Sequence, residues 1–477
     1  MMNHAVINET SSSPQSTILA HCRTPTDPLL PQLSVILDLT AMKRLLQEKI
    51  FGSVQERKRF HILSCEIDRV RHKPESSCMV TYRLQIEDQT TGETGEQILC
   101  GRAYPERRSQ SQWDKARLRA VVPPRFGKPI VYLPELEMIL WSFPNDRKMD
   151  ALLTLENSDR FMSAILPQLL ALHLGDEWMV AGANRKLVQY NGEHTCAVRI
   201  DATVIHQATH RQQTVTLFEK SYYNEEGSET YRGMQQLWQS ESRRSGQLII
   251  AKPIWYEPSL KTLWQLGLSG NTFIHVDMKR PEFFDLLPKV AAAVASLHTV
   301  TLISSKQTRL TDVLLNLESN RQMVSQVVPT CREQLHSLVD RLVIQSERLE
   351  KHSVATLHGD LQFENILVDG DQVALIDLDT LSQGDPLFDV GSFVAFLIYR
   401  GIRRNVSGKA MESMCEIFIR HYEKSVPWSI SRSALRWHIA AALVNERAAR
   451  FVTRRKVNEE FTQVDDLIHC ALQMVME

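Results

Sequence analysis

Apolar and polar residues alternate along two neighbouring stretches in the N-terminal third of the chain. The alternation runs from Cys78 to Ile86 and resumes from Ile98 to Tyr104, with the polar segment EDQTTGETGEQ between them. A period of two is typical of half-buried β-strands. The pattern therefore predicts two strands joined by a polar turn.

Three blocks of this region recur later in the chain. In each pair the later block lies 118 or 124 residues after the earlier one: Glu75–Val80 and Glu193–Val198, Ile98–Tyr104 and Thr216–Tyr222, Lys128–Leu136 and Lys252–Leu260. Blocks that recur in the same order at nearly the same offset predict two copies of one small β-rich lobe, at roughly residues 55–150 and 180–270. The alternative is a coincidental match between unrelated strands.

Beyond about residue 280 the apolar residues follow a helical period instead. Pro281–His298 opens with a proline at a plausible first helical position. A second helix carries four leucines on one face: Leu335, Leu338, Leu342 and Leu349. We interpret them as core residues, with a partner-helix surface as the alternative. Residues 435–455 are a further amphipathic helix, and we interpret the basic stretch 447–456 as its solvated face.

These patterns divide the chain into four parts. Residues 1–30 are rich in Ser, Thr and Pro, a composition that predicts a disordered tail. Residues 31–175 contain the first copy of the β-rich lobe and residues 176–270 the second. Residues 271–477 form a helical region.

Composition narrows the class of protein. The net charge of −1 gives no electrostatic reason to expect nucleic acid or a membrane surface as a partner. The eight cysteines include no CxxC pair, which argues against a zinc site or a disulfide framework and favours a reducing cytoplasm. We see no signal-peptide pattern, and the longest apolar stretch, residues 390–398, is shorter than the roughly 20 residues of a membrane span.

A group of carboxylates lies at the ends of a predicted hairpin. Apolar runs at Ile366–Val368 and Val373–Ile376 flank the turn residues 369–371. The acidic residues sit at the strand ends rather than in this turn: Asp360, Glu364, Asp377 and Asp379. A simple hairpin with exposed acids is one interpretation. A chemical site is the other.

The spacing of three of these polar residues favours a metal site. A hairpin brings its two ends together, so Asn365 and Asp377 should meet near Asp360. Oxygen ligands of this kind suit Mg²⁺, which usually keeps substrate phosphates and water in its shell. Phosphoryl transfer needs metal clamps on the phosphates and one residue that receives the proton of the attacking hydroxyl. We therefore predict Asp360 as the catalytic base, and Asn365 and Asp377 as the metal ligands.

Three motifs in this segment carry a family resemblance. They are HGDLQFENIL at 358–367, IDLD at 376–379 and GDPLFDVG at 384–391. In this order they closely resemble the catalytic loop, the metal-binding segment and the following element of aminoglycoside phosphotransferases and their choline, homoserine and sugar kinase relatives. The resemblance implies an α+β, protein-kinase-like fold: a small antiparallel β lobe and a larger helical lobe, here with an extra degenerate copy of the small lobe at the N-terminus.

The resemblance also implies roles for the surrounding residues. His358, Asp385 and Asp389 would support the loop, and Asp379 would be either a second metal ligand or, as we favour, an acceptor for a backbone amide. Gly359 stands where protein kinases have arginine. This favours a small-molecule kinase over a protein kinase.

The nucleotide side of the site would lie in the second copy. Lys220 is predicted to hold the phosphates, although an exposed edge-strand lysine would have the same pattern. Glu229, on a helix that Ser228 would cap, is the candidate partner of Lys220 or else a residue that favours the helix dipole. Asn191 and Gly192 would form the turn over the phosphates.

The first copy has Arg102 at the position of Lys220 and no HGD segment. Arginine does not replace lysine neutrally at such a site, so we predict that the first copy is degenerate. It would cap the acceptor site, form a dimer contact or regulate access. The sequence offers no way to choose among these roles.

The prediction is a cytoplasmic kinase that uses Mg²⁺ and ATP or GTP to phosphorylate a hydroxyl of a small molecule. The alternative is a nucleotide-binding pseudokinase that acts as a scaffold or regulator. The acceptor and the oligomeric state are not indicated by the sequence.

Overall fold

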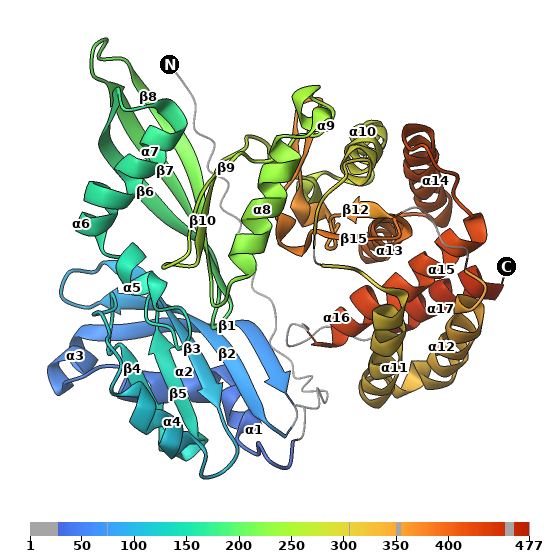
Figure 1. The fold of residues 1–477 in the computed structure, drawn as a ribbon. Coiled ribbons are helices and arrows are strands. Elements are labelled where there is room, and N and C mark those ends of the chain that lie inside the picture. The colour runs from blue at the N-terminus through green and yellow to red at the C-terminus, as the bar shows by residue number, and fades with distance from the viewer. Residues whose placement is uncertain (1–26, 74, 305, 350–353, 454–461, 477) are drawn as a thin grey trace, which may run out of the picture.

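The structure is a computed structural model that describes residues 27–73, 75–304, 306–349, 354–453 and 462–476. It has three parts: the first lobe (residues 27–145), the second lobe (146–266) and the helical lobe (271–476). In Figure 1 the first lobe is blue to teal, the second lobe is mostly green, and the helical lobe runs from yellow to red. The predicted tail lies outside the described residues except for 27–30. These four residues are folded, and Leu30 is fully buried.

The first lobe is a five-stranded sheet with helices α1 and α2 on one face and α4 on the other. Its strand order is β1-β2-β3-β5-β4. The elements are α1 (Leu33–Ile36), α2 (Leu39–Lys49), α3 (Val54–Arg59), β1 (Phe60–Lys73), β2 (Ser77–Asp88), β3 (Thr94–Ala103), α4 (Ser109–Ala116), β4 (Ile130–Leu133) and β5 (Met138–Ser142).

The second lobe repeats this plan. Its strand order, β6-β7-β8-β10-β9, matches that of the first lobe strand for strand. The elements are α5 (Ala151–Leu155), α6 (Ser158–Arg160), the π-helix Phe161–Ile165, α7 (Leu166–Leu174), β6 (Trp178–Asn191), β7 (Thr195–His206), β8 (Gln212–Tyr222), α8 (Glu226–Trp238), α9 (Glu241–Arg244), β9 (Pro253–Glu257) and β10 (Thr262–Leu266). The register also repeats, since Met79 faces Arg102 as Ala197 faces Lys220.

The repeat includes the helices that precede each sheet. Alternate residues of β2 are buried together with residues of α1 and α2. Alternate residues of β7 are buried in the same way with residues of α5 and α7. A strand that buries one face must cover it with another element, and each lobe uses the helices just before its strands. The predicted boundary at 175 is therefore too late, because residues 151–174 pack on the second sheet.

The helical lobe carries the motif segment. Its elements are β11 (Asn271–Thr272), α10 (Pro281–His298), α11 (Leu310–Val327), α12 (Arg332–Ser346), β12 (Ala355–Leu357), β13 (Ile366–Asp369), β14 (Gln372–Leu375), β15 (Ser382–Gly384), α13 (Leu387–Arg403), α14 (Gly408–Ser425), α15 (Arg432–Ala442), the π-helix Leu443–Ala448, α16 (Ala449–Thr453) and α17 (Thr462–Met476). Short 3-10 turns lie at 134–136, 273–275, 329–331, 363–365 and 378–380.

The predicted helix at Pro281–His298 is α10, and three of the four predicted core leucines are fully buried on α12. Leu349 lies beyond the end of α12 but packs against the same core. Helix α8 stands between the second sheet and the helical lobe in Figure 1, and its Met234 and Leu237 belong to the core of the helical lobe. The predicted fold class is confirmed. Within the described residues, every helix is too short or too polar to cross a membrane.

Candidate active site

The predicted hairpin forms and brings its polar ends together. Strands β13 and β14 pair from Ile366 with Leu375 to Asp369 with Gln372. The pairing continues at the open end, where the Ile376 amide donates to the Asn365 carbonyl at 3.0 Å. Asn365 and Asp377 therefore lie at one end of the hairpin, as the spacing predicted.

Gly359 adopts a backbone conformation that residues with a side chain rarely adopt. Its φ is +79°, and an added Cβ would lie 2.4 Å from the Thr380 carbonyl oxygen. The Thr380 hydroxyl also donates to the His358 carbonyl at 2.8 Å. A larger side chain at 359 would push the catalytic loop away from the metal-binding segment. This close approach explains why the loop has glycine at this position.

Asp389 binds the backbone of the catalytic loop. Its carboxylate accepts the amides of His358 at 2.5 Å and Gly359 at 2.9 Å, and it lies 3.1 Å from His298 Nε2. Burial alone would raise the pKa of Asp389, but the interactions with His298 and the loop hold the pKa below its usual value. His358 Nε2 lies 2.9 Å from the Ile376 carbonyl. These contacts match the supporting roles predicted for Asp389 and His358.

Asp385 contacts the start of the next helix. Its Oδ1 accepts the Leu387 amide at 2.9 Å, at the start of α13. Its Oδ2 lies 4.0 Å from His438 Nε2. Asp385 thus fixes the end of α13 that carries Asp389 one turn later. Through this contact Asp385 supports the element that holds the loop.

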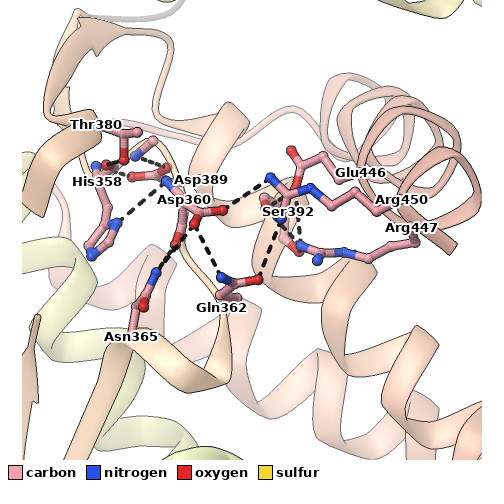
Figure 2. Close-up of polar contacts among 11 residues, drawn as sticks. His358, Asp360, Gln362, Asn365, Thr380, Asp389, Ser392, Glu446, Arg447 and Arg450 are labelled. Atoms are coloured by element: carbon pink, nitrogen blue, oxygen red, sulfur yellow. Dashed lines mark hydrogen bonds and ion pairs between the residues drawn. The ribbon is translucent and has the colours of Figure 1, made fainter. Parts of the chain in front are cut away.

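Asp360 and Asn365 are linked at the top of the loop (Figure 2). Asn365 Nδ2 donates to the Asp360 carbonyl at 2.8 Å and approaches Asp360 Oδ2 at 3.4 Å. This commits the amide nitrogen to the loop and leaves Oδ1 to act as a ligand. Gln362 Nε2 donates to Asp360 Oδ2 at 3.1 Å.

Lys220 reaches the metal-binding segment from the second lobe. Its ammonium lies 2.6 Å from Asp377 Oδ1 and 2.6 Å from Asp379 Oδ2. Burial would lower the pKa of Lys220, but the two carboxylates raise it above its usual value. In Asp377, burial would raise the pKa, but the charge of Lys220 and its hydrogen bond lower the pKa below its usual value. The exposed-lysine alternative is wrong, because Lys220 is engaged by two acids.

The donor set fits a magnesium ion. Asn365 and Asp377, at the same end of the hairpin, carry an amide and a carboxylate oxygen, the ligand type that Mg²⁺ prefers. Asp377 has a left-handed backbone, with φ of +57°, just after the second strand of the hairpin. Within the described residues there is no group of three or more His, Cys, Asp or Glu suited to a metal. The predicted site would thus depend on phosphate and water oxygens for its remaining ligands.

Asp379 has two partners besides any metal. Tyr222 donates its hydroxyl to Asp379 Oδ1 at 2.7 Å, and Lys220 contacts Oδ2. Both of these partners are side chains of the second lobe, and neither is the predicted backbone amide. The predicted amide contact is therefore replaced by contacts that join the two lobes.

Glu229 is not brought to Lys220. It contacts Lys306 at 3.4 Å, and its side chain is 45% exposed. Helix α8 begins at Glu226, so Ser228 lies inside the helix and does not cap it. The carboxylates of Asp377 and Asp379 take the position at Lys220 that was predicted for Glu229. Lys306 in turn donates to the Asp379 carbonyl at 3.2 Å, so α8 is tied to the metal-binding segment through Lys306.

The predicted phosphate turn is bound to the first lobe. An added Cβ on Gly192 would lie 2.2 Å from Cys100 Sγ, so this glycine permits close packing between the lobes. Asn191 donates its side chain to Thr195 across the turn at 3.0 Å. The next residue, Glu193, has φ of +59°, and its amide donates to Asp146 Oδ2 at 2.8 Å. The turn thus packs against the first lobe through Gly192 and is bound to Asp146, at the start of the second lobe, through the Glu193 amide.

Two arginines that the sequence analysis assigned to a solvated face lie at the site. Arg450 Nη2 contacts Asp360 Oδ1 at 3.2 Å, and Arg450 Nη1 approaches Gln362 at 3.5 Å. Arg447 is 4% exposed and contacts Glu446 at 3.0 Å. Figure 2 shows the helix that carries them opposite the catalytic loop. The π-helix at 443–448 interrupts the helical period here, and so the amphipathic pattern placed these arginines on the wrong face.

Residues 251–418 match the phosphotransferase enzyme family. The resemblance inferred from the three motifs is thereby confirmed over the segment that carries them. A comparison with curated protein sequences found no match.

Three solved structures are similar to the chain at low identity. A thermostable mutant of aminoglycoside phosphotransferase APH(4)-Ia has 15% identity and a TM-score of 0.42, over 65% of this chain and 98% of that one. A putative aminoglycoside phosphotransferase from Ralstonia eutropha has 13% identity and a TM-score of 0.44, over 62% and 93%. Choline kinase LicA from Streptococcus pneumoniae has 13% identity and a TM-score of 0.40, over 65% and 98%.

Proposed function

We propose that the protein is a kinase that transfers the γ-phosphoryl group of a magnesium-bound nucleotide, ATP or GTP, to a hydroxyl of a small molecule. The observation that carries the proposal is the meeting of Lys220 with Asp377 across two lobes, beside Asp360 and Asn365. Phosphoryl transfer depends on positioning and electrostatic stabilisation, and this group offers both.

Each residue has one task in the proposal. Asp360 orients the acceptor hydroxyl and receives its proton. Asn365 and Asp377 hold the magnesium ion, which neutralises phosphate charge when bound. Lys220 binds the phosphates and leaves the carboxylate of Asp377 to the metal. Asp389 and His358 keep the loop in place throughout.

A nucleotide-binding pseudokinase is the second candidate. The observation in its favour is the turn at 191–194, whose Glu193 amide is taken by Asp146. Kinases use the corresponding turn to cover the phosphates. A protein in which this turn is bound to Asp146 rather than to the phosphates would bind nucleotide without efficient phosphoryl transfer.

Phosphorus NMR tests the proposal. Purified protein is mixed with Mg·ATP or Mg·GTP and pooled hydroxyl compounds, beside the Asp360→Asn variant. A new phosphomonoester signal that disappears in the variant supports the kinase. Nucleotide line broadening that Asp377→Ala removes, with no new signal, supports the pseudokinase.

A further inference from the structure

The acceptor side of the site is marked by arginine side chains. Arg450 contacts the carboxylate of Asp360 itself, the group to which the acceptor hydroxyl must come. Arg447 stands beside it, with its guanidinium 4.5 Å from the ring centre of Phe396. Arginine binds carboxylate and phosphate groups in a planar, two-pronged geometry. Arg450 therefore places a positive charge beside the carboxylate that receives the hydroxyl proton.

Arg447 is more deeply buried than an arginine normally is. Its Nη2 contacts Ser392 and Glu446, while its Nε has no hydrogen-bond partner within the described part of the chain. Burial lowers the pKa of Arg447, and the neighbouring Arg450 lowers it further, against the charges of Glu446 and Asp360. A buried guanidinium with an unsatisfied nitrogen is costly unless an anion or another acceptor is supplied.

A cavity of about 330 Å³ adjoins the same loop. It is lined by residues 274–278, Phe363, Arg400 and Arg404. Phe363 packs on Phe396, which packs in turn on Arg447, so the cavity and Arg450's helix share one wall of α13. Arg400 Nε also lacks a hydrogen-bond partner among the residues that the structure describes.

The acidic side chains around this surface lie close to arginines. Glu446 is held by Arg447 and Ser392. The charge of Glu364 acts on both Arg400 and Arg447, and Asp277 lines the cavity. An ammonium group placed next to Asp360 would also meet the guanidinium of Arg450, and like charges repel.

We propose that the acceptor is an anionic alcohol: its carboxylate or phosphate group is bound by Arg450, with Arg400 and Arg404 of the cavity, while its hydroxyl faces Asp360. This inference rests on the proposed function, since it identifies the substrate class of the same site. Binding of the anion draws Arg450 toward the ligand and frees Asp360 to accept the proton of the hydroxyl. Arg450 is then a positioning and specificity residue.

Four pools of acceptors test the inference with Mg·ATP and the full chain. They are hydroxy acids such as glycerate, phosphorylated alcohols such as glycerol 3-phosphate, neutral alcohols such as glycerol, and amino alcohols such as choline. The expected result is transfer to a hydroxy acid or to a phosphorylated alcohol, and the two anionic pools identify which anion is bound. Transfer confined to the neutral or amino-alcohol pool overturns the inference while the proposed function stands.

Variants then test the arginines. Arg450→Gln is expected to raise KM for the anionic acceptor at least tenfold and to leave KM for ATP within twofold, and Arg450→Lys should recover part of the loss. Arg400→Gln with Arg404→Gln should raise the same KM without loss of folding. The matched control is Arg432→Gln, an exposed residue paired with Glu423 on the neighbouring helix. An increase in kcat with Arg450→Gln would show an inhibitory contact instead and overturn the inference.

Binding gives a readout that does not need transfer. Saturation-transfer NMR with the two anionic pools is run on the wild type and on Arg450→Gln, each with Mg·ADP present. If no pool is phosphorylated but an anion binds and Arg450→Gln abolishes its signal, the proposed function fails and the anion site stands. If no anionic compound binds, the inference fails.

Discussion

In the second lobe, Lys220 faces Ala197 across the central strands and reaches Asp377 and Asp379 of the helical lobe. In the first lobe, Arg102 faces Met79 at the matching position and reaches Glu193 of the second lobe. The two copies therefore share a fold, a register and a basic residue that points toward the next unit. They differ in what that unit supplies: a metal-binding segment for Lys220, and a fixed glutamate for Arg102.

The Arg102 contact is a closed ion pair rather than an open site. Arg102 binds both oxygens of Glu193, at 2.9 and 2.7 Å, and Arg147 binds the same two oxygens at 2.8 and 2.7 Å. Glu193 itself is buried. Two bidentate arginines leave no room for a phosphate at Arg102. The position that would hold nucleotide in the first lobe instead holds the tip of the second lobe.

The turns of the two lobes preserve a further common device. Glu75 and Glu193 both have φ of +59°. The amide of Glu75 donates to Asp27 at 2.8 Å, as that of Glu193 donates to Asp146 at 2.8 Å. The two lobes thus share this turn and the aspartate that accepts its amide. In the second lobe, the side chain of Glu193 also joins the lobes.

The largest expected difference between the copies is catalytic. Lys220→Ala should lower kcat/KM for phosphoryl transfer at least 100-fold, because loss of one preorganised charge at a developing anion typically costs 10²- to 10³-fold. Arg102→Ala should lower it less than tenfold, because Arg102 contacts no catalytic residue. A coupled assay of ADP release measures both. Equal losses in the two variants would mean that the first lobe also serves the reaction.

The next effect is on stability, where Arg102 should matter more than Lys220. Arg102→Ala should lower the free energy of unfolding by about 3 kcal/mol, because it leaves part of a buried carboxylate charge uncompensated. Urea unfolding followed by tryptophan fluorescence measures it. Arg199→Ala is the control. Arg199 forms an exposed ion pair with Asp201 within the second lobe, and this pair should contribute about 1 kcal/mol or less. A loss as small as that of the control would show that the lobes are not held by this pair.

Acid should weaken the same contact. Burial alone would raise the pKa of Glu193, but Arg147 and Arg102 lower it to about 2 from 4.5. A lowered pKa stabilises the fold above the unfolded value and loses that stability as pH falls toward the folded value. Between pH 6 and pH 3.5 the pair should lose about 1 kcal/mol. Urea titrations of wild type and Glu193→Gln should therefore converge over this range, and parallel curves would contradict the assignment.

The smallest effect concerns Glu229. Glu229→Gln should change kcat/KM less than threefold, because Glu229 contacts the half-buried Lys306 rather than Lys220. Asp379→Asn is the comparison and should cost more, because Asp379 touches both Lys220 and Tyr222. A loss with Glu229→Gln as large as that with Asp379→Asn would restore Glu229 as the partner of Lys220 in the working enzyme.

Local spacing predicted much of this site. The hairpin, the meeting of Asn365 with Asp377, and the repeat with Arg102 at the position of Lys220 all follow from residues close in sequence or from an exact offset. The motifs at 358–391 fix one loop by short-range contacts, and such contacts can be read without knowing the rest of the fold.

Contacts between distant segments were the ones missed. The pair of Glu193 with Arg102 joins two copies, so nothing near either residue indicated it. Arg450, which contacts Asp360, follows a π-helix that shifts the helical period, so the amphipathic pattern did not indicate this contact. Helices α5–α7 were assigned to the wrong copy because the recurring blocks lie only in the strands.

Nucleotide should bind to the second lobe and not to the first. Isothermal titration of the full chain with a non-hydrolysable Mg·ATP analogue tests it most directly, beside Lys220→Ala and Arg102→Ala. The expected result is one site per chain, weakened at least tenfold by Lys220→Ala and little changed by Arg102→Ala. Two sites per chain, or one site that only Arg102→Ala removes, would contradict it.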